Sequence, residues 1–329
     1  MAPIEPMRTE CFGRHEISMP ESFRFRHSGS SVTFYYRHDT DFETVEAQVV
    51  DSDAAYERFV ASVASRAADI SAESNEKTGG SMLLAQEEIE SNTLLLRYHR
   101  SDVSDRSHVH EVHRLVSGKH LFLKADSFKG EWASVEARLK QLAAGARAIS
   151  PAAGPIGGDF CLGGLVLDPV DDYESAKFSY RAGNLAHRDV VLAIESETFK
   201  RDEAAARVVQ RLDGNFSGLG LRPVVLRKGA FEFGGAPAEQ WLGREQVDGQ
   251  VEHLFVAESY PASPGLRSPA LQVELRTGGV PSSQPDAGLP PYRRPTMPPT
   301  TGQARMASSL SDDQAIALWD EMVQSIKAR

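Results

Sequence analysis

The chain has 329 residues, which is long enough for two domains with separate hydrophobic cores. Hydrophobic residues make up 41% and charged residues 25%, the composition of a folded globular protein. The 46 acidic side chains outnumber the 36 lysines and arginines, so the formal net charge is −10. A negative protein repels nucleic-acid phosphates and anionic lipid. The composition therefore disfavours nucleic-acid binding and membrane-surface roles, and it favours a basic partner.

The sequence contains no apolar run of the roughly 18 to 20 residues needed to span a bilayer. The first ten residues, MAPIEPMRTE, contain two prolines and no apolar run, so we expect no secretory signal within them. The two cysteines, Cys11 and Cys161, are interpreted either as buried free thiols or as a disulfide. A disulfide would require an oxidising compartment, and the sequence leaves the compartment open.

The first half of the chain predicts two amphipathic helices among short strands. Strand-like runs bounded by turn residues occur at residues 11–20, 22–26, 31–37, up to Val50, and at 82–88, 93–99, 108–116 and 120–124. The first helix is predicted to begin at Ser52 and Asp53 and to bury the apolar face Tyr56, Phe59, Val60, Val63 and Ile70. The second helix carries its apolar residues at the same spacing, at Trp132, Val135, Leu139, Leu142 and Ala146.

The second half repeats this order of elements. The segment at residues 160–169, FCLGGLVLDP, parallels the cysteine, glycine and proline pattern of residues 11–20. A strand at 190–195 leads to a helix with Ala205, Val208, Val209 and Leu212, and strands follow at 223–233, 240–247, 251–258 and 270–276. The last helix is predicted to begin at Ser311 with a capping box to Gln314, and to bury Ile316, Trp319, Met322, Val323 and Ile326.

Strands grouped between helices, without strict alternation, predict an α+β fold. We expect two domains of similar topology, each an antiparallel sheet with helices packed on it. The segment SPAAGPIGG at residues 150–158 supplies the prolines and glycines typical of a linker. The predicted domains are therefore residues 1–150 and residues 151–329, and the second contains a proline-rich loop at 278–303.

The loop at 278–303 contains seven prolines, so it can form neither a helix nor an interior strand. One interpretation is a surface connection between the last strand and the last helix. The other is a binding loop, because long irregular loops are often functional. Its large side chains include Tyr292, Arg293 and Arg294, and tyrosine and arginine are enriched at binding hot spots. These three residues are the candidate partner-binding residues.

The sequence contains no recognisable catalytic motif. The nearest approach to the nucleophile elbow G-x-S-x-G is Gly214–Gly218, which has an extra residue before Ser217 and follows a helix, so it is interpreted as a loop. Gly234 and Gly235 lie between two predicted strands and indicate a hairpin turn rather than a phosphate-binding loop. We predict no catalytic residue, no cofactor and no metal site.

Three histidines within six positions are the strongest candidates for chemistry. In a strand, His108 and His110 point to one face and His113 to the other. Two histidines on one face could hold zinc with a third ligand from elsewhere in the chain, but an HExxH motif is absent. The serine and arginine around these histidines favour solvated strand residues.

Short segments spread over nearly the whole chain carry a family signature. They are CFGR at 11–14, ISMP at 17–20, FCLG at 160–163, LRKG at 226–229, EQWL at 239–242, FVAES at 255–259, PALQVELRTG at 269–278, AIALWD at 315–320 and IKAR at 326–329. In order and spacing these segments resemble the Tle-cognate immunity proteins for the fourth class of type VI secretion lipase effectors. The similarity is strongest from Phe160 to the end of the chain.

The resemblance implies an immunity protein with two α+β domains and no enzyme activity. Such a protein binds and inhibits a phospholipase effector in the periplasm, and so protects the producing cell from its own toxin. The missing signal sequence departs from this expectation and leaves a cytoplasmic location open. Two other interpretations stay open: a two-domain protein that binds a small molecule or lipid, and a hydrolase with a site around His108, His110 and His113.

Overall fold

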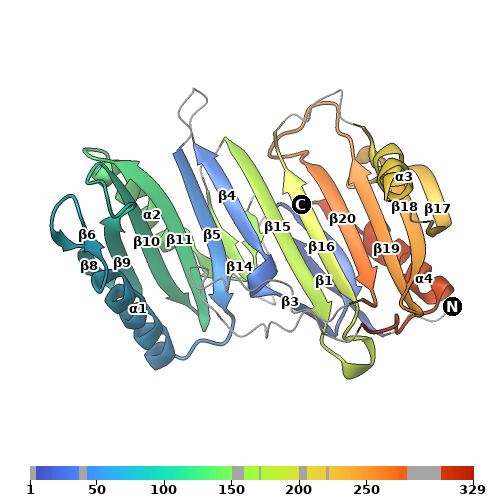
Figure 1. The fold of residues 1–329 in the computed structure, drawn as a ribbon, viewed down its shortest axis with the longest axis horizontal. Coiled ribbons are helices and arrows are strands. Elements are labelled where there is room, and N and C mark those ends of the chain that lie inside the picture. The colour runs from blue at the N-terminus through green and yellow to red at the C-terminus, as the bar shows by residue number, and fades with distance from the viewer. Residues whose placement is uncertain are drawn as a thin grey trace. The chain divides into compact units, whose positions relative to one another are not determined.

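The computed structural model describes residues 5–36, 43–149, 159–169, 172–199, 206–219, 222–279 and 305–329. These residues form two compact units. The first unit combines the N-terminal residues through Ser30 with the residues from Ser175 onward, and the second contains Ser31–Glu174. In each unit, helices pack on an antiparallel sheet (Figure 1), which confirms the predicted α+β class.

The sheet of the second unit has the strand order β4-β5-β11-β10-β9-β8. Its strands are β4 (Ser31–Tyr36), β5 (Glu43–Asp51), β8 (Leu83–Glu90), β9 (Thr93–His99), β10 (Ser107–Val116) and β11 (Lys119–Phe128). Helix α1 (Tyr56–Ser71) follows β5, and helix α2 (Trp132–Gly145) follows β11. A short hairpin of β6 (Ser74–Asn75) and β7 (Gly80–Ser81) connects α1 to β8.

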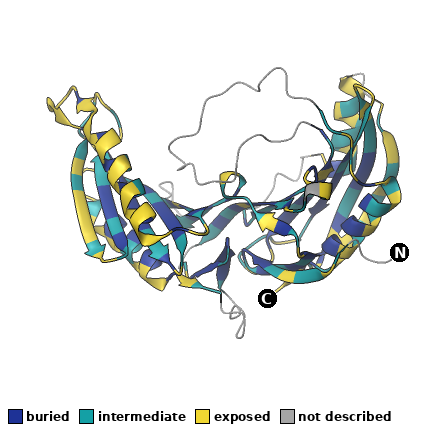
Figure 2. Cartoon of the chain, turned by 90° about the horizontal axis from the view of Figure 1, so that it is seen from below, coloured by how far each residue is buried: buried dark blue, intermediate teal, exposed yellow. Residues whose placement is uncertain are grey.

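The two helices of this unit cover opposite faces of its sheet. Successive side chains of a strand point to opposite faces. Glu111 of β10 bonds with Arg66 of α1, whereas the preceding residue, His110, contacts Glu136 of α2. Strand β10 is therefore buried on both sides, and Figure 2 shows the buried residues concentrated along the strands.

The sheet of the first unit has the strand order β15-β16-β20-β19-β18-β17, and the short strand β3 (Phe23–Phe25) also pairs with β15. Its main strands are β15 (Tyr173–Ala182), β16 (Val191–Glu197), β17 (Val224–Phe233), β18 (Ala236–Val247), β19 (Gln250–Ser259) and β20 (Ala270–Thr277). Helix α3 (Val208–Gly218) follows β16, and helix α4 (Asp312–Gln324) follows β20. Here too the helices lie on opposite faces, because Trp241 stacks with Phe216 of α3 while the preceding Gln240 accepts a hydrogen bond from Trp319 of α4.

The two units share one topology. In each unit, two antiparallel strands come first and a helix follows them. Four antiparallel strands come next, and the last of these pairs with the second strand of the unit. A helix on the other face of the sheet ends the unit. Each unit also has a small sheet of three strands. In the first unit β1 (Met7–Phe12), β2 (His15–Pro20) and β21 (Lys327–Ala328) have the order β1-β2-β21. In the second, β12 (Arg147–Ala148), β13 (Phe160–Leu162) and β14 (Leu165–Leu167) have the order β12-β14-β13.

The small sheets show that the repeats exchange their first hairpins. Hairpin β1–β2 opens the chain but pairs with β21 at its end, and hairpin β13–β14 opens the second repeat but pairs with β12 at the end of the first. The compact units are consequently not the halves of the chain. The predicted linker at 150–158 lies outside the described residues, so the division into residues 1–150 and 151–329 stays a prediction. Neither cysteine is free, because Cys11 and Cys161 are both disulfide-bonded.

Of three predictions that rest on neighbouring residues, the structure confirms two. Ser311 caps α4 and forms the predicted capping box with Gln314. Gly234 and Gly235 form the turn between β17 and β18 with φ of 60° and 77°, a conformation that glycine adopts without strain. Helix α1 instead begins at Tyr56, later than predicted, and its N-cap residue Ala55 makes no side-chain capping bond.

Each unit holds one deeply buried glutamate between its sheet and its first helix. Glu111 is 1% exposed and accepts hydrogen bonds from Arg66 of α1, at 2.8 and 3.2 Å, and from the Tyr98 hydroxyl at 2.7 Å. Glu258 is likewise bound by Arg211 of α3 and by the Tyr260 hydroxyl. A buried carboxylate is tolerated when such partners replace water, and the arginine of each pair fixes its helix on the sheet.

We expect Arg66→Ala to lower the free energy of unfolding by about 3 kcal/mol, because Glu111 would be left charged and buried without its arginine. Urea unfolding followed by fluorescence measures this change. Arg58→Ala is the matched control, since Arg58 lies on the same helix in an exposed ion pair with Asp51 at 3.5 Å. Its loss should cost less than about 1 kcal/mol. Equal effects of the two substitutions would contradict the role assigned to the buried pair.

Candidate partner-binding surface

The three candidate residues Tyr292, Arg293 and Arg294 lie outside the described residues, so the structure gives no geometry for them. The two ends of their loop are described. Gly279 and Met306 exchange two backbone hydrogen bonds of 2.9 Å, and Arg305 forms a bidentate pair with Glu252 of β19. A Cβ atom at Gly278 would lie 2.8 Å from the carbonyl oxygen of Val251, so this position requires glycine. The loop therefore leaves from and returns to a fixed base beside β19.

The histidines of β10 are buried, so their interpretation as solvated residues is wrong. His108, His110 and His113 are each almost fully enclosed. The physical reason is that α1 and α2 cover both faces of this strand, so residues pointing either way lose contact with water. The sequence around the histidines does not show this coverage, because the helices that provide it are distant in the chain.

His108 and His110, which lie on the face of the sheet covered by α2, form hydrogen bonds with other side chains. Trp132 Nε1 donates to His108 Nδ1 at 3.0 Å. The two ring nitrogens of His110 lie 2.7 Å from Ser127 Oγ and 3.1 Å from Glu136 Oε1. Arg97 donates to the same Glu136 oxygen at 2.7 Å. Both nitrogens of His110 have protein partners, which leaves neither of them for a metal or a substrate.

On the α1 face, His113 Nδ1 lies 3.0 Å from His120 Nε2, and His113 Nε2 lies 3.5 Å from Glu111. Burial raises the pKa of Glu111, but its contacts with His113 and Arg66 outweigh this effect and hold the pKa at about 2. Within the described ranges, no group of three or more histidine, cysteine or acidic side chains is arranged to hold a metal. The arrangement fits a packed polar core better than a hydrolytic centre.

Ser217 lies within helix α3, and not in a loop as expected. The helix continues past Leu212 to Gly218, because its last turns pack on β18. Phe216 stacks on Trp241 with ring centroids 5.0 Å apart, and Asp213 accepts a hydrogen bond from Trp241 Nε1 at 3.0 Å. Ser217 lies in the last turn of a helix, so it lacks the strand-to-helix turn that exposes a nucleophile.

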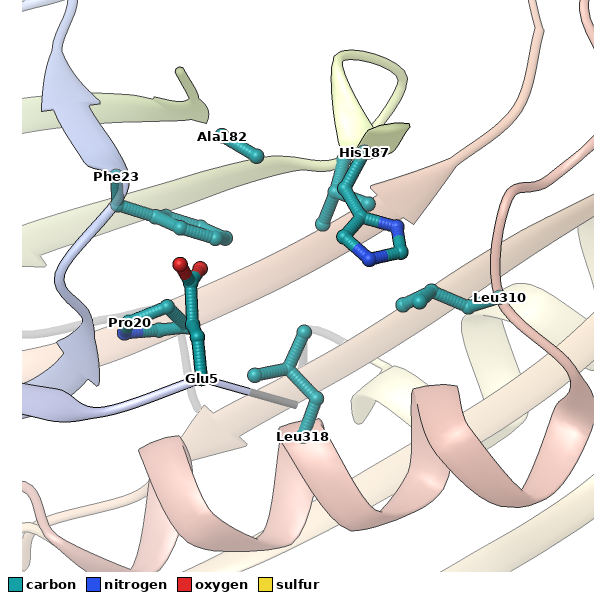
Figure 3. A pocket seen from close by; sticks show the side chains of 8 residues that line it. Glu5, Pro20, Phe23, Ala182, His187, Leu310 and Leu318 are labelled. Atoms are coloured by element: carbon teal, nitrogen blue, oxygen red, sulfur yellow. The ribbon is translucent and has the colours of Figure 1, made fainter. Parts of the chain in front are cut away.

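A small pocket lies within the first unit, between β2, β3 and α4 (Figure 3). Its volume is about 10 Å³, which is room for about one water molecule. It is lined mainly by apolar side chains, with Glu5 and His187 as the titratable ones. A pocket of this size does not accommodate a lipid or a metabolite.

The net charge is concentrated in the second unit. Residues 31–174 contain 24 acidic and 14 basic side chains, and the rest of the chain contains 22 of each. The second unit therefore carries the whole formal charge of −10. Among the described residues, no helix is both long and apolar enough to cross a membrane.

Two residues predicted for the core are instead exposed on the second unit. Tyr56 is 49% exposed and Val60 is 36% exposed, both on α1. The buried face of α1 consists of Phe59, Val63, Ala67 and Ile70. The periodicity of the sequence places Tyr56 and Val60 on the apolar face, and it does not show that both stay exposed in the folded unit.

The sequence profile of the Tle cognate immunity protein 4 C-terminal domain matches residues 155–329. Comparison with curated protein sequences finds no match.

Solved structures show the same fold over nearly the whole chain. The apo structure of the immunity protein TplEi of the type VI secretion system (T6SS) from Pseudomonas aeruginosa has a TM-score of 0.67 at 20% identity, and the match covers 98% of this chain and 97% of that one. A Tle4–Tli4 complex gives a TM-score of 0.68 at 19% identity, with coverage of 98% and 97%. TplEi complexed with a peptide named "L" gives 0.62 at 19% identity, with 98% of both chains covered.

Because several histidines are buried, we predict that the free energy of unfolding falls in acid. Burial lowers the pKa of His120 well below its ordinary value and lowers that of His110, and burial together with the charge of Arg329 lowers the pKa of His15 to about 4. The unfolded chain binds protons at these sites near pH 6.5, whereas the folded chain does not. The free energy of unfolding should therefore be level above about pH 6.5 and fall as the pH drops toward 4, by up to about 1.4 kcal/mol per pH unit for each such histidine.

Urea unfolding at pH 7.5, 6.0 and 5.0 measures this dependence. His120→Gln should reduce the slope between pH 6.5 and 5, because one titrating group is removed. A stability that stays level down to pH 5 would show that these histidines are protonated in the folded protein.

Proposed function

Because this chain belongs to the family of Tle cognate immunity protein 4, we propose that it binds a phospholipase effector of the type VI secretion system and blocks its activity. The observation that carries the proposal is the family match over residues 155–329. The relatives support it in two ways: TplEi is an immunity protein of this secretion system, and a solved complex joins Tli4 with Tle4. The structural similarity to these relatives also covers the residues before 155.

Inhibition of this kind requires no catalytic residue on the inhibitor. A lipase must admit a lipid through an apolar path, and a protein that covers this path or holds a lid closed stops turnover. The buried histidines, the helical Ser217 and the small pocket give no support to a hydrolase or to a lipid-binding protein. We infer that the chain acts by contact alone and is not an enzyme.

We also infer that the protein works in the periplasm, where such effectors meet membrane phospholipid. Cys11 and Cys161 are both disulfide-bonded, and disulfides persist in oxidising compartments such as the bacterial periplasm. Cell fractionation tests this inference. Recovery of the protein from the cytoplasmic fraction with reduced thiols would contradict it.

The purified chain should capture the lipase encoded by the adjacent gene in a near-stoichiometric complex and abolish its hydrolysis of phosphatidylethanolamine–phosphatidylglycerol vesicles. The chain alone should release no fatty acid from the same vesicles. Size-exclusion chromatography measures the complex, and fatty-acid release measures the inhibition. A lipase that retains full activity at a twofold excess of this chain would refute the proposed function.

We further propose that the loop of residues 278–303 contributes to binding through Tyr292, Arg293 and Arg294. Replacing all three with alanine should weaken the complex by at least about 2 kcal/mol, mainly through faster dissociation. Folding should be unaffected, since the base of the loop is held by the Gly279–Met306 and Arg305–Glu252 contacts, which the substitutions leave in place. Surface plasmon resonance gives both rate constants. Unchanged affinity, both for this variant and for a variant with a glycine–serine loop, would make the loop a spacer.

A further inference from the structure

The outward face of α1 is an apolar surface that stays exposed among the described residues. Five residues of its two central turns are exposed, and none of them is charged: Val60, Ala61, Ala64, Ser65 and Ala68. Tyr56 adds a half-exposed aromatic ring at the start of the helix. Figure 2 shows this side of the helix in yellow. Exposed tyrosine and valine on one helix face are typical of a contact surface rather than of a face selected for solvation.

The inner side of α1 holds this surface in a fixed orientation. Its buried residues pack against Leu96 of β9 and against Met82, which precedes β8. These buried residues are Phe59, Val63, Ala67 and Ile70. On the same side Arg66 reaches Glu111 at 2.8 Å and the Tyr98 hydroxyl at 3.0 Å. The helix cannot rotate without breaking a buried ion pair. The outward face is therefore preorganised, and binding to it would order few additional side chains.

The border of this surface is acidic. Exposed Asp53 and Glu57 lie at the N-terminal end of the helix, and exposed Asp69 and Glu73 lie at its C-terminal end. The one arginine on the outward side, Arg58, is engaged with Asp51 and with the backbone oxygen of Asp53. The surface also belongs to the unit that carries the entire net charge of −10. A partner that fits it is apolar at the centre of its contact patch and basic around it.

Helix α2, on the other face of the same sheet, provides an internal comparison. It also exposes alanines, including Ala137, but it exposes no large apolar side chain. The basic residues Arg138 and Lys140 lie along it and are paired with Glu43 and Glu87. The combination of exposed apolar side chains with an acidic border thus distinguishes α1 from α2.

We propose that the outward face of α1 is a docking surface for the effector, which presents to it a patch that is apolar at its centre and basic at its border. This inference rests on the proposed function. The acidic border speeds the encounter with the effector, and the apolar centre around Tyr56, Val60 and Ala64 sets the lifetime of the complex. This proposal explains why Tyr56 and Val60, which were predicted to be buried, are apolar and yet exposed. They are apolar for contact with the partner and not for the fold.

Ala64→Arg tests the centre of the surface, because it places a long charged side chain where the partner must approach closely. Arginine has nearly the helix propensity of alanine, so α1 should stay folded. Ala137→Arg on α2 is the matched control. The probe is the adjacent-gene lipase with its catalytic serine replaced by alanine. We expect Ala64→Arg to weaken binding at least about tenfold and Ala137→Arg to change it less than about twofold.

Two further variants separate the centre from the border. Tyr56→Ala should speed dissociation at least about fivefold with little change in the association rate. Glu57→Lys should slow association severalfold at about 20 mM salt, and this effect should shrink at about 300 mM salt. Circular dichroism of each variant checks that the helix content is unchanged.

The outcomes distinguish this inference from the proposed function. If the wild-type chain binds the lipase, and Ala64→Arg and Tyr56→Ala bind it as tightly as the wild type, the α1 surface is refuted while the proposed function stands. If Ala64→Arg and Ala137→Arg weaken binding equally, the effect is not specific to α1, and the surface is again refuted. If the wild-type chain does not bind the lipase at all, the proposed function fails and the inference fails with it.

Discussion

The sheets of this protein are covered on both faces, and this constraint determines much of the remaining structure. Strands β10 and β19 carry buried residues in succession, so each sheet requires a helix on either side. Polar residues on these strands are also removed from water, and each must find a protein partner. His110 finds Ser127 and Glu136, and Glu111 finds Arg66 and Tyr98. The buried polar groups of the second unit are a consequence of two-sided coverage, and they fix the helices that provide it.

The sequence predicted what neighbouring residues determine. The spacing of Val135, Leu139 and Leu142 marks α2, the Ser311–Gln314 box marks the start of α4, and Gly234–Gly235 marks a hairpin. It did not predict what distant residues determine. The burial of His113 depends on α1, the last turns of α3 depend on Trp241, and the pairing of β2 depends on residues at the other end of the chain. Periodicity carries no information on these contacts.

The prediction of partner-binding residues was limited in the same way. Composition alone singled out Tyr292, Arg293 and Arg294, and their loop lies outside the described residues. Tyr56 and Val60 of α1 were assigned to the core, because they fit a helical period. Only the folded structure shows that both are exposed. Likewise the net charge of the whole chain does not show that one compact unit holds all of it, because the limits of that unit come from the structure.

The exchanged hairpins have a consequence for how the protein is made. Strand β2 pairs with β21 through His15–Ala328 and Glu16–Lys327, and the Ser18 amide donates to the Ser325 hydroxyl at 2.7 Å. This small sheet can therefore close only after β2 and a strand about 300 residues later in the chain have come together. Contacts of such sequence separation form slowly, because a long loop must be ordered before they contribute stability. The sheet of β1, β2 and β21 is therefore expected to be among the last parts of the protein to form.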